Sequence, residues 1–207
     1  MKYFDISPLL SPSTPVFPGD QVFERAITMA IAKGDNIGLS WIKSTVHIGA
    51  HTDAPSHYHK DGETIEQRDL SFYIGKCQVI DVTHVGARRI LPSDIEATPI
   101  TAERILFKSN SFAHDQSFQM EFTSLSPELI DQLAAKKVRL VGIDSPSVDP
   151  ADSKDLPSHA ALYHHNLAVL EGIDLGAVPP GRYQLVALPL RIEGADASPV
   201  RAVLFPF

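Results

Sequence analysis

The sequence predicts one domain of the mixed α/β or α+β class, and three observations support this prediction. A chain of 207 residues has the length of one ordinary domain. Hydrophobic residues make up 43% and charged residues 21%, which is typical of a globular protein with a full core. Strand-like segments outnumber helix-like ones. Neither a repeat nor a Gly/Ser-rich linker divides the chain, so we expect a single domain over residues 1–207.

Seven segments are expected to be β-strands, because each is rich in β-branched and aromatic residues. Sixteen prolines, spread from Pro8 to Pro206, indicate many short turns between these segments. The expected strands are residues 22–31, 37–48, 78–82, 104–107, 139–143, 183–192 and 200–205.

Helix signals are fewer, and the clearest covers residues 126–133. Ser126 stands at the N-cap position and Pro127 at the first helical position, and three apolar residues share one face: Leu129, Ile130 and Leu133. A second helix is expected to begin near residue 158 and to end at 163 or 164. A short turn is expected after residues 91–94.

Composition and charge argue against several classes of partner. The net charge of -7 argues against a general nucleic-acid binder, which needs a basic face to neutralise phosphates. No apolar stretch approaches the ~20 residues that span a bilayer, and the N-terminus lacks the apolar region of a secretory signal. We therefore expect no nucleic acid, no membrane and a cytoplasmic location. Cys77 lies in an apolar run and is expected to be a buried, inert thiol.

Five of the nine histidines lie between residues 47 and 59, and their spacing is informative. His47, His51, Asp53 and His57 are separated by 4, 2 and 4 residues. On a β-strand, even spacing directs all four side chains to the same face. On a helix, Asp53 would point away from His47 and His51, and Pro55 would disfavour a continued helix. The pattern therefore favours extended backbone.

A straight strand would nevertheless hold His47 and His51 too far apart to share a cation. Their separation along it would be roughly 13 Å, whereas each imidazole must come within ~2.1 Å of a shared metal. We therefore expect a bend at Gly49, and we expect regular pairing to end at Pro55. Burying so many polar side chains without a cation would be costly. The segment predicts a metal site formed by His47, His51 and Asp53, with His57 beside it as an acid/base.

The type of ligand narrows the choice of metal. Imidazoles combined with a carboxylate suit zinc, with manganese or cobalt as alternatives. The carboxylate of Asp53 can bridge two metals, and a second metal would need further ligands. His159 at the start of the second helix and Glu171 after an apolar run are candidates for that role. The other histidines show no comparable pattern and are expected to be surface or satisfied core residues: His59, His84, His114, His164 and His165.

The pattern HxGxHxDxPxH over residues 47–57 resembles the signature of the metal-dependent cyclase-like hydrolases. Other matching stretches extend this resemblance over nearly the whole chain; they are residues 4–7, 18–20, 61–62, 142–150, 152–154, 170–172, 187–190 and 197–202. Within that superfamily, the Ser-Val-Asp-Pro stretch at 147–150 and the C-terminal stretches resemble the bacterial kynurenine formamidases, also called arylformamidases. The resemblance implies a single swivelling β/β/α (cyclase-like) domain with a mixed sheet, and a homodimer.

The resemblance also implies a function and a set of ligands. It implies a zinc-dependent amidase that hydrolyses N-formyl-L-kynurenine to L-kynurenine and formate in tryptophan catabolism. Two Zn²⁺ per subunit are expected, with Mn²⁺ or Co²⁺ as alternatives. His47 and His51 would hold one ion and His159 would help to hold the other, while Asp53 and Glu171 would bridge both. A metal-activated water would attack the formyl carbon, with His57 as proton donor and acceptor.

One residue departs from the formamidase pattern. Phe17 stands before Pro-Gly-Asp, where the family usually carries a tryptophan that stacks on the substrate. Phenylalanine keeps an apolar ring face but lacks the indole N–H and some of the area. Phe17 is therefore expected to contact the substrate, with a core position as the alternative. The change leaves the chemistry untouched and bears on substrate preference and affinity. The alternatives are another cyclase-like amide hydrolase such as an isatin hydrolase, or a non-catalytic metal-binding module. A serine nucleophile is disfavoured because no GxSxG elbow is present.

Overall fold

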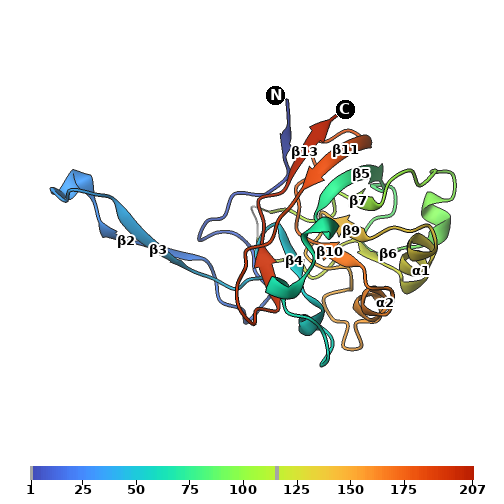
Figure 1. Ribbon diagram of the computed structural model, residues 1–207, viewed down its shortest axis with the longest axis horizontal. Helices are drawn as coiled ribbons and strands as arrows, with labels where there is room; N and C mark the ends of the chain where they lie inside the picture. The colour runs from blue at the N-terminus through green and yellow to red at the C-terminus, as the bar shows by residue number, and fades with distance from the viewer. Residues whose placement is uncertain (1, 115–116) are drawn as a thin grey trace.

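A mixed sheet of seven strands, curled into a half-barrel, forms the centre of the computed structural model, which describes residues 2–114 and 117–207 (Figure 1). Its first four strands pair antiparallel and the remaining ones pair in parallel. In spatial order the strands are β1 (Phe4–Asp5), β13 (Val203–Pro206), β11 (Gly181–Val186), β5 (Ile74–Asp81), β7 (Arg104–Lys108), β9 (Leu140–Ile143) and β10 (Ala168–Leu170). This arrangement confirms the mixed-sheet cyclase-like α/β fold.

Two α-helices of the described residues pack on one side of the parallel half of this sheet (Figure 1). Helix α1 (Pro127–Ala135) begins as expected, because the hydroxyl of Ser126 accepts a hydrogen bond from the backbone N–H of Leu129. Helix α2 (Pro157–His165) follows β9 and leads into β10. Both helices therefore serve as crossovers between parallel strands, which is the connection that parallel pairing requires.

Successive residues of the central strands point into two different cores. In β7, Leu106 belongs to a core on the face away from the helices, whereas Ile105 and Phe107 belong to the core shared with the helices. Leu133 of α1 and Leu162 of α2 complete that second core. Strands buried on both faces need apolar residues at consecutive positions, which explains why the expected strands read as unbroken apolar runs.

Short strands and 3₁₀ turns surround the sheet. Three two-stranded sheets pair β2 (Glu24–Met29) with β3 (Leu39–Lys43), β4 (His51–Asp53) with β12 (Ala197–Pro199), and β6 (Arg89–Ile90) with β8 (Ser124–Leu125). The 3₁₀ turns are η1 (Ile31–Lys33), η2 (Pro55–His57), η3 (Ile65–Gln67), η4 (Leu70–Phe72) and η5 (Pro92–Ile95). In the described part of the chain, no helix is both long and apolar enough to cross a membrane.

Two of the expected strands are too long. The strand expected over 37–48 ends at Lys43, because the chain then turns away from β2 to carry residues 44–50 into the body of the protein. The strand expected over 183–192 ends at Val186, shortly before Pro189, which has no N–H to donate to a ladder. The remaining strand and helix predictions are confirmed to within four residues at each end.

Candidate metal centre

The backbone around Gly49 makes the sharp turn that the sequence predicted. Gly49 has a φ of +55°, in the left-handed region, and a Cβ there would lie 2.6 Å from Leu10. Gly172 has a φ of +62°, and its Cβ would lie 2.2 Å from the carbonyl oxygen of Gly49. Two glycines therefore allow two segments to touch, and this contact brings His51 beside Glu171. Their backbones exchange hydrogen bonds of 3.0 and 2.9 Å.

The same bend corrects the expectation that one strand face carries the whole histidine motif. Strand β4 covers only His51–Asp53, so only these two motif residues share a strand face. His47 precedes the bend, and His57 lies in η2 because Pro55 starts a 3₁₀ turn. The four side chains meet through the bend and the turn, and not through strand alternation.

His47 and His51 present nitrogen atoms to one oxygen of Asp53. Asp53 Oδ1 lies 3.0 Å from His47 Nδ1 and 3.7 Å from His51 Nε2. The carbonyl oxygen of Gly49 accepts a hydrogen bond of 2.9 Å from His51 Nδ1, so His51 Nε2 keeps its lone pair for another partner. The His51 and Asp53 side chains are buried, and that of His47 is nearly so.

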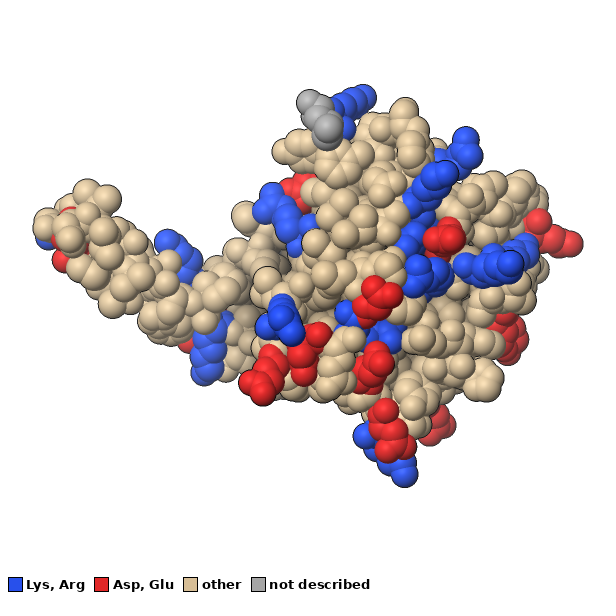
Figure 2. Space-filling model, in the orientation of Figure 1, with Lys and Arg blue, Asp and Glu red and all other residues tan. Residues whose placement is uncertain are grey.

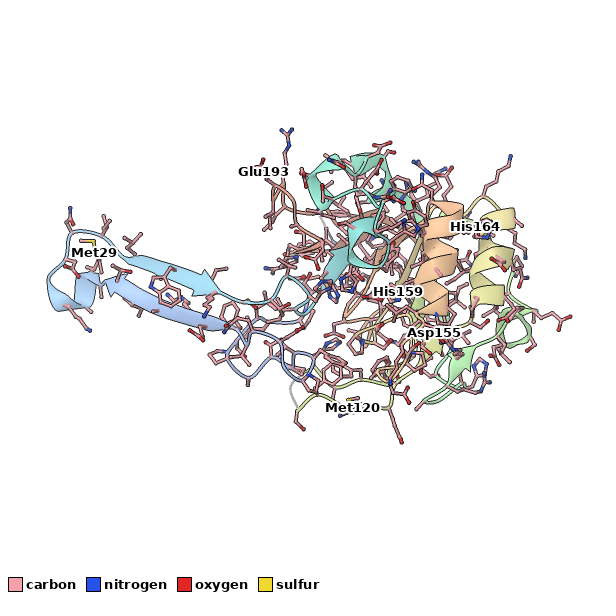
Figure 3. All side chains as sticks on the ribbon, turned by 90° about the horizontal axis from the view of Figure 1, so that it is seen from below. Met29, Met120, Asp155, His159, His164 and Glu193 are labelled. Carbon is pink, nitrogen blue, oxygen red and sulfur yellow. The ribbon has the colours of Figure 1, made fainter. Side chains whose placement is uncertain are left out.

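The second half of the cluster is formed by His159 and Glu171. His159 Nε2 lies 3.5 Å from Asp53 Oδ2 and 3.8 Å from Glu171 Oε1. The other oxygen of Glu171, Oε2, lies 3.3 Å from His51 Nε2. Each of the two carboxylates therefore directs one oxygen towards His51 and the other towards His159. Figure 3 shows His159 near one end of α2, with the exposed His164 near the other.

Asp149 holds His159 in this orientation, and its role was not foreseen from the sequence. Its Oδ2 atom accepts hydrogen bonds of 2.8 Å from His159 Nδ1 and 3.0 Å from the His159 backbone N–H. Arg89 donates a bond of 2.8 Å to the Oδ1 atom of Asp149. The other ring nitrogen of His159, Nε2, therefore faces Asp53 and Glu171. Such a carboxylate–histidine pair is the usual support of a metal ligand.

The electrostatics of the cluster show how strongly its carboxylates attract positive charge. Burial acts to lower the pKa of His47, but the nearby carboxylates of Asp53 and Asp196 outweigh burial and raise that pKa to about 9. Burial also opposes protonation of His159, yet Asp149 and Asp53 raise its pKa to about 10. For Asp53, burial acts to raise the pKa, while His159 and His47 hold it well below its ordinary value. A bound cation would displace these imidazole protons.

Two observations indicate that the cluster fits a metal. Asp53 Oδ1 is buried and has no hydrogen-bond partner among the described residues, although His47 Nδ1 lies 3.0 Å away. Ligand atoms at ~2.0–2.1 Å from a tetrahedral ion lie about 3.3 Å apart, close to most of the separations above. The ligand atoms of His47, His51 and Asp53 lie within 4.8 Å of one another, as do those of Asp53, His159 and Glu171.

His57 lies beside the cluster and is held by Asp196, which the sequence did not indicate. The Oδ2 atom of Asp196 accepts hydrogen bonds from His57 Nδ1 at 3.1 Å and from His47 Nε2 at 2.9 Å. The rings of His47 and His57 lie 4.2 Å apart, centre to centre. Asp196 is 139 residues from His57 in the chain, so no local spacing could have revealed the contact.

The cluster lies in the wall of a cavity of about 690 Å³. His47, His51, Asp53, His57 and Glu171 all line it. His159 is buried behind them and is not among the lining residues.

Phe17 lines the cavity, together with aromatic residues that the sequence did not single out. The Phe17 ring packs edge-on against Phe118 at 5.5 Å, and Phe118 contacts Phe112 and Phe122 in turn. His114, expected to be a surface or satisfied core histidine, also lines the cavity. The segment 112–122 carries these side chains, and no periodic pattern in it pointed to the cavity.

Other residues follow their simpler interpretations. Cys77 is buried, and burial raises the pKa of its thiol to about 12, as expected of an inert side chain. His59 stacks on Tyr163 with ring centres 3.7 Å apart. His165 bonds to Asp131 on the surface. These contacts are those of ordinary structural residues.

Comparison with known proteins places this arrangement in context. A family model named Cyclase, described as "Putative cyclase", matches residues 4–150. A solved structure described as a potential metal-dependent hydrolase with cyclase activity is 33% identical, with a TM-score of 0.83, and covers 98% of this chain and 96% of that one.

Two further structures are similar. One is described as a predicted metal-dependent hydrolase from Bacillus stearothermophilus. It is 33% identical with a TM-score of 0.83, and the match covers 98% of this chain and 97% of that one. An isatin hydrolase bound to the product analogue thioisatinate is 22% identical with a TM-score of 0.84, and covers 100% of this chain and 93% of that one. At that lower identity the likeness shows a shared fold alone.

Proposed function

Because this chain belongs to the cyclase family, with 33%-identical relatives described as metal-dependent hydrolases, we propose that it is a zinc-dependent arylformamidase. Its substrate would be N-formyl-L-kynurenine, which it would hydrolyse to L-kynurenine and formate. The observation that carries this proposal is the placement of the His/Asp/Glu cluster and His57 in the wall of a cavity lined by phenylalanines.

The cluster would hold two divalent ions. His47 and His51 would bind one ion, and His159 would bind the other. Asp53 and Glu171 would each offer one carboxylate oxygen to the first ion and the other oxygen to the second. This assignment is supported by the directions of the carboxylate oxygens, because each carboxylate has one oxygen near His51 and the other near His159. When bound, ions of this kind lower the pKa of a coordinated water towards neutrality and polarise a carbonyl oxygen.

His57 would move the protons of the reaction. Because its Nδ1 atom donates to Asp196, its Nε2 atom is the one left to accept and release a proton. Histidine is the side chain that most often transfers protons in catalysis. His57 would take a proton from the attacking water and deliver it to the aromatic amine as the C–N bond breaks.

The cavity wall supports an aromatic acyl-amide substrate. Phe17, Phe112, Phe118 and Phe122 all line the cavity. Aromatic rings favour edge-to-face or offset contact with another ring. A cavity of about 690 Å³ also suits one small ligand, since ligand sites span roughly 300–1,000 Å³.

A second candidate is hydrolysis of a cyclic aryl amide such as isatin. Phe17 favours this alternative, because the formamidases usually carry a tryptophan at that position and this chain offers a smaller ring. Isatin is a compact fused-ring lactam without the amino-acid tail of formylkynurenine. Both reactions cleave an amide bond to an arylamine nitrogen, so the same ions and the same His57 would serve either.

A direct comparison of the two substrates tests the proposal. Purified protein supplied with Zn²⁺ would be assayed with N-formyl-L-kynurenine by the absorbance of kynurenine, and with isatin by ring opening. We expect a kcat/KM for formylkynurenine at least tenfold above that for isatin. The reverse ratio would establish the second candidate, and no turnover of either, with metal bound, would indicate a non-catalytic metal-binding module.

A further inference from the structure

The wall of the cavity carries fixed charge of one sign. Acidic and basic side chains are mixed over the visible face of the body of the protein (Figure 2). The cavity differs, because no lysine or arginine is found among the described residues that line it, although the chain contains 18 of them. Four carboxylates line it instead: Asp20, Asp53, Glu171 and Asp196. The wall should therefore attract cations and repel anions.

Of these four carboxylates, that of Asp20 has no task in the metal cluster. Asp53 and Glu171 face the cation positions, and one oxygen of Asp196 accepts hydrogen bonds from two histidine rings. Within residues 2–114 and 117–207, the exposed carboxylate of Asp20 forms neither a hydrogen bond nor an ion pair. It is therefore available to a ligand in the cavity.

A tight turn holds Asp20 beside the ring of Phe17. The backbone N–H of Asp20 donates a hydrogen bond of 3.0 Å to the carbonyl oxygen of Phe17. Pro18 and Gly19 occupy the two central positions, and Gly19 has a φ of +101°, in keeping with the positive φ that a type II turn requires there. The first and last residues of such a turn lie within about 7 Å of each other. An aromatic ring and a free carboxylate are therefore presented to the cavity together.

An aromatic ring beside a carboxylate is suited to an ammonium group. The carboxylate accepts charge-assisted hydrogen bonds from the N–H groups, and the face of the ring attracts the cation electrostatically. Phe17 is 45% exposed, so part of its ring is free for such contact. Phe118, with its ring centre 5.5 Å from that of Phe17, extends the aromatic wall.

The imidazoles of the wall do not offer an anionic ligand the partner that a lysine or arginine would. Three of the four belong to the cluster already described. The fourth is His114, which lies near the buried Asp144. Burial raises the pKa of Asp144, and the charge of His114 acts in the opposite direction. The charge of a protonated His114 is therefore partly balanced by that carboxylate.

We propose that Phe17 and Asp20 form an ammonium subsite, and that the protein selects formamides of arylamines that carry a free amine and needs no carboxylate on them. This inference rests on the proposed hydrolysis of an aryl formamide and adds the charge that the substrate must carry. N-formyl-L-kynurenine carries both groups, so its ammonium would be bound and its carboxylate would stay in solvent. The decarboxylated amine, N-formylkynurenamine, is then an equally good substrate or a better one.

Four formamides with one aromatic core test this preference. They are N-formyl-L-kynurenine; N-formylkynurenamine, which lacks the carboxylate; the deaminated acid, which lacks the ammonium; and ortho-formamidoacetophenone, an uncharged ketone that lacks both. Each releases an aminophenyl ketone that is followed by its absorbance. We expect kcat/KM for N-formylkynurenamine to equal or exceed that for N-formyl-L-kynurenine, and to be at least about tenfold above those for the acid and the uncharged ketone. An acid that matches N-formylkynurenamine, or a loss of more than about tenfold on removal of the carboxylate, would overturn the proposal.

Substitution of Asp20 separates its charge from its shape. Asp20→Asn should bring kcat/KM for N-formylkynurenamine to within about threefold of that for the uncharged ketone, because the ammonium loses its ionic partner. Asp20→Glu keeps the charge and should keep most of the preference. Asp131→Asn, which removes an exposed carboxylate from α1, is the matched control and should keep the wild-type ratio. Equal ratios in Asp20→Asn and the wild type would overturn the assignment of the subsite to Asp20.

Binding of the products distinguishes failure of the subsite from failure of the proposed function. If none of the four formamides is hydrolysed with metal bound, the proposed function is wrong, whatever the charge of the substrate. Isothermal titration calorimetry would then compare kynurenamine with the deaminated aminophenyl acid. We expect kynurenamine to bind the wild type at least about tenfold more tightly, and Asp20→Asn to lose this difference. Equal affinities of the two products for the wild type, or no binding of kynurenamine, would overturn the subsite.

Discussion

The Oδ2 atom of Asp196 lies 3.1 Å from the Nδ1 atom of His57. The same oxygen lies 2.9 Å from His47 Nε2, so one carboxylate joins the proposed acid/base to a proposed metal ligand. Asp196 is half exposed, whereas Asp53 on the other side of His47 is buried. The two carboxylates therefore divide two tasks: Asp53 faces the cation position and Asp196 orients the two imidazoles.

Replacing Asp196 should reduce turnover more than metal binding. Asp196→Asn removes the charge that orients His57 while keeping the size of the side chain. We expect kcat to fall by about tenfold or more, as for lost support of a general acid/base. Metal content should change little, because His47 also faces Asp53. In the double variant with His57→Ala, the two losses should not multiply, since both act through one histidine. If the losses of kcat multiplied fully in the double variant, Asp196 and His57 would act independently of each other.

Replacing Asp149 should act on metal affinity. Asp149→Asn leaves the bond from His159 Nδ1 without its charged acceptor, and Arg89 loses its ionic partner. Changes of this kind typically reduce metal affinity by about 10–100-fold. Competition with a zinc indicator would measure the change. The exposed carboxylate Asp131, which bonds His165 on the surface, provides the control Asp131→Asn and should leave affinity unchanged. Equal affinities for all three proteins would exclude a supporting role for Asp149.

The metal-free protein should lose stability as the pH rises. The pKa values of His47 and His159 are raised to about 9 and about 10, against about 6.5 in an unfolded chain. Between these limits the folded state binds more protons than the unfolded state, so the free energy of unfolding falls with increasing pH. The contribution is fully present below about pH 6.5 and is lost by about pH 10.

Thermal unfolding of EDTA-treated protein between pH 6 and pH 10 would measure this effect. We expect the unfolding midpoint to fall over that range, and to fall less in a His159→Gln variant. Added Zn²⁺ should stabilise the wild type more at higher pH, because protons then compete less for the imidazoles. A midpoint that rises with pH in the metal-free protein would contradict this assignment of protons.

Gly172→Ala should destabilise the protein and weaken its metal site. A left-handed φ costs an alanine roughly 1–2 kcal/mol, and the added Cβ would also lie 2.2 Å from the carbonyl oxygen of Gly49. Gly194→Ala is the matched control, because Gly194 has a φ of +70° but no atom within 4 Å of the added Cβ. We expect denaturant unfolding to show a clearly larger loss for Gly172→Ala. Equal losses of stability in the two variants would mean that the close contact between residue 172 and Gly49 does not add to the destabilisation.

Much of the fold was predictable, because the core strands are buried on both faces and their apolar runs are unambiguous. Ser126 and Pro127 likewise marked the start of α1 correctly. The predicted strand over 37–48 was too long, since its exposed apolar residues resemble those of a core strand. An apolar hairpin that leaves the body cannot be distinguished by composition from a strand that joins it.

From residue spacing alone, the candidate site was predictable only where its residues lie close together in the chain, whereas His159 and Glu171 were assigned as ligands through the family resemblance. The motif at 47–57 gave the bend at Gly49 and four of the clustered side chains. Asp149 and Asp196 could not be found in this way, because each contributes a single carboxylate held in place by distant packing. The phenylalanine wall at 112–122 was missed for a similar reason, as its side chains follow no regular period.

Metal analysis of purified protein, prepared without chelators and assayed in parallel for amide hydrolysis, tests the central claim most directly. We expect about two transition-metal ions per chain in the wild type, and a similar content in His57→Ala with turnover reduced by ~10²–10⁴-fold. His51→Ala should lose metal and activity together. Wild-type protein that works at full speed without stoichiometric metal, or a His51→Ala variant that keeps both, would contradict the account.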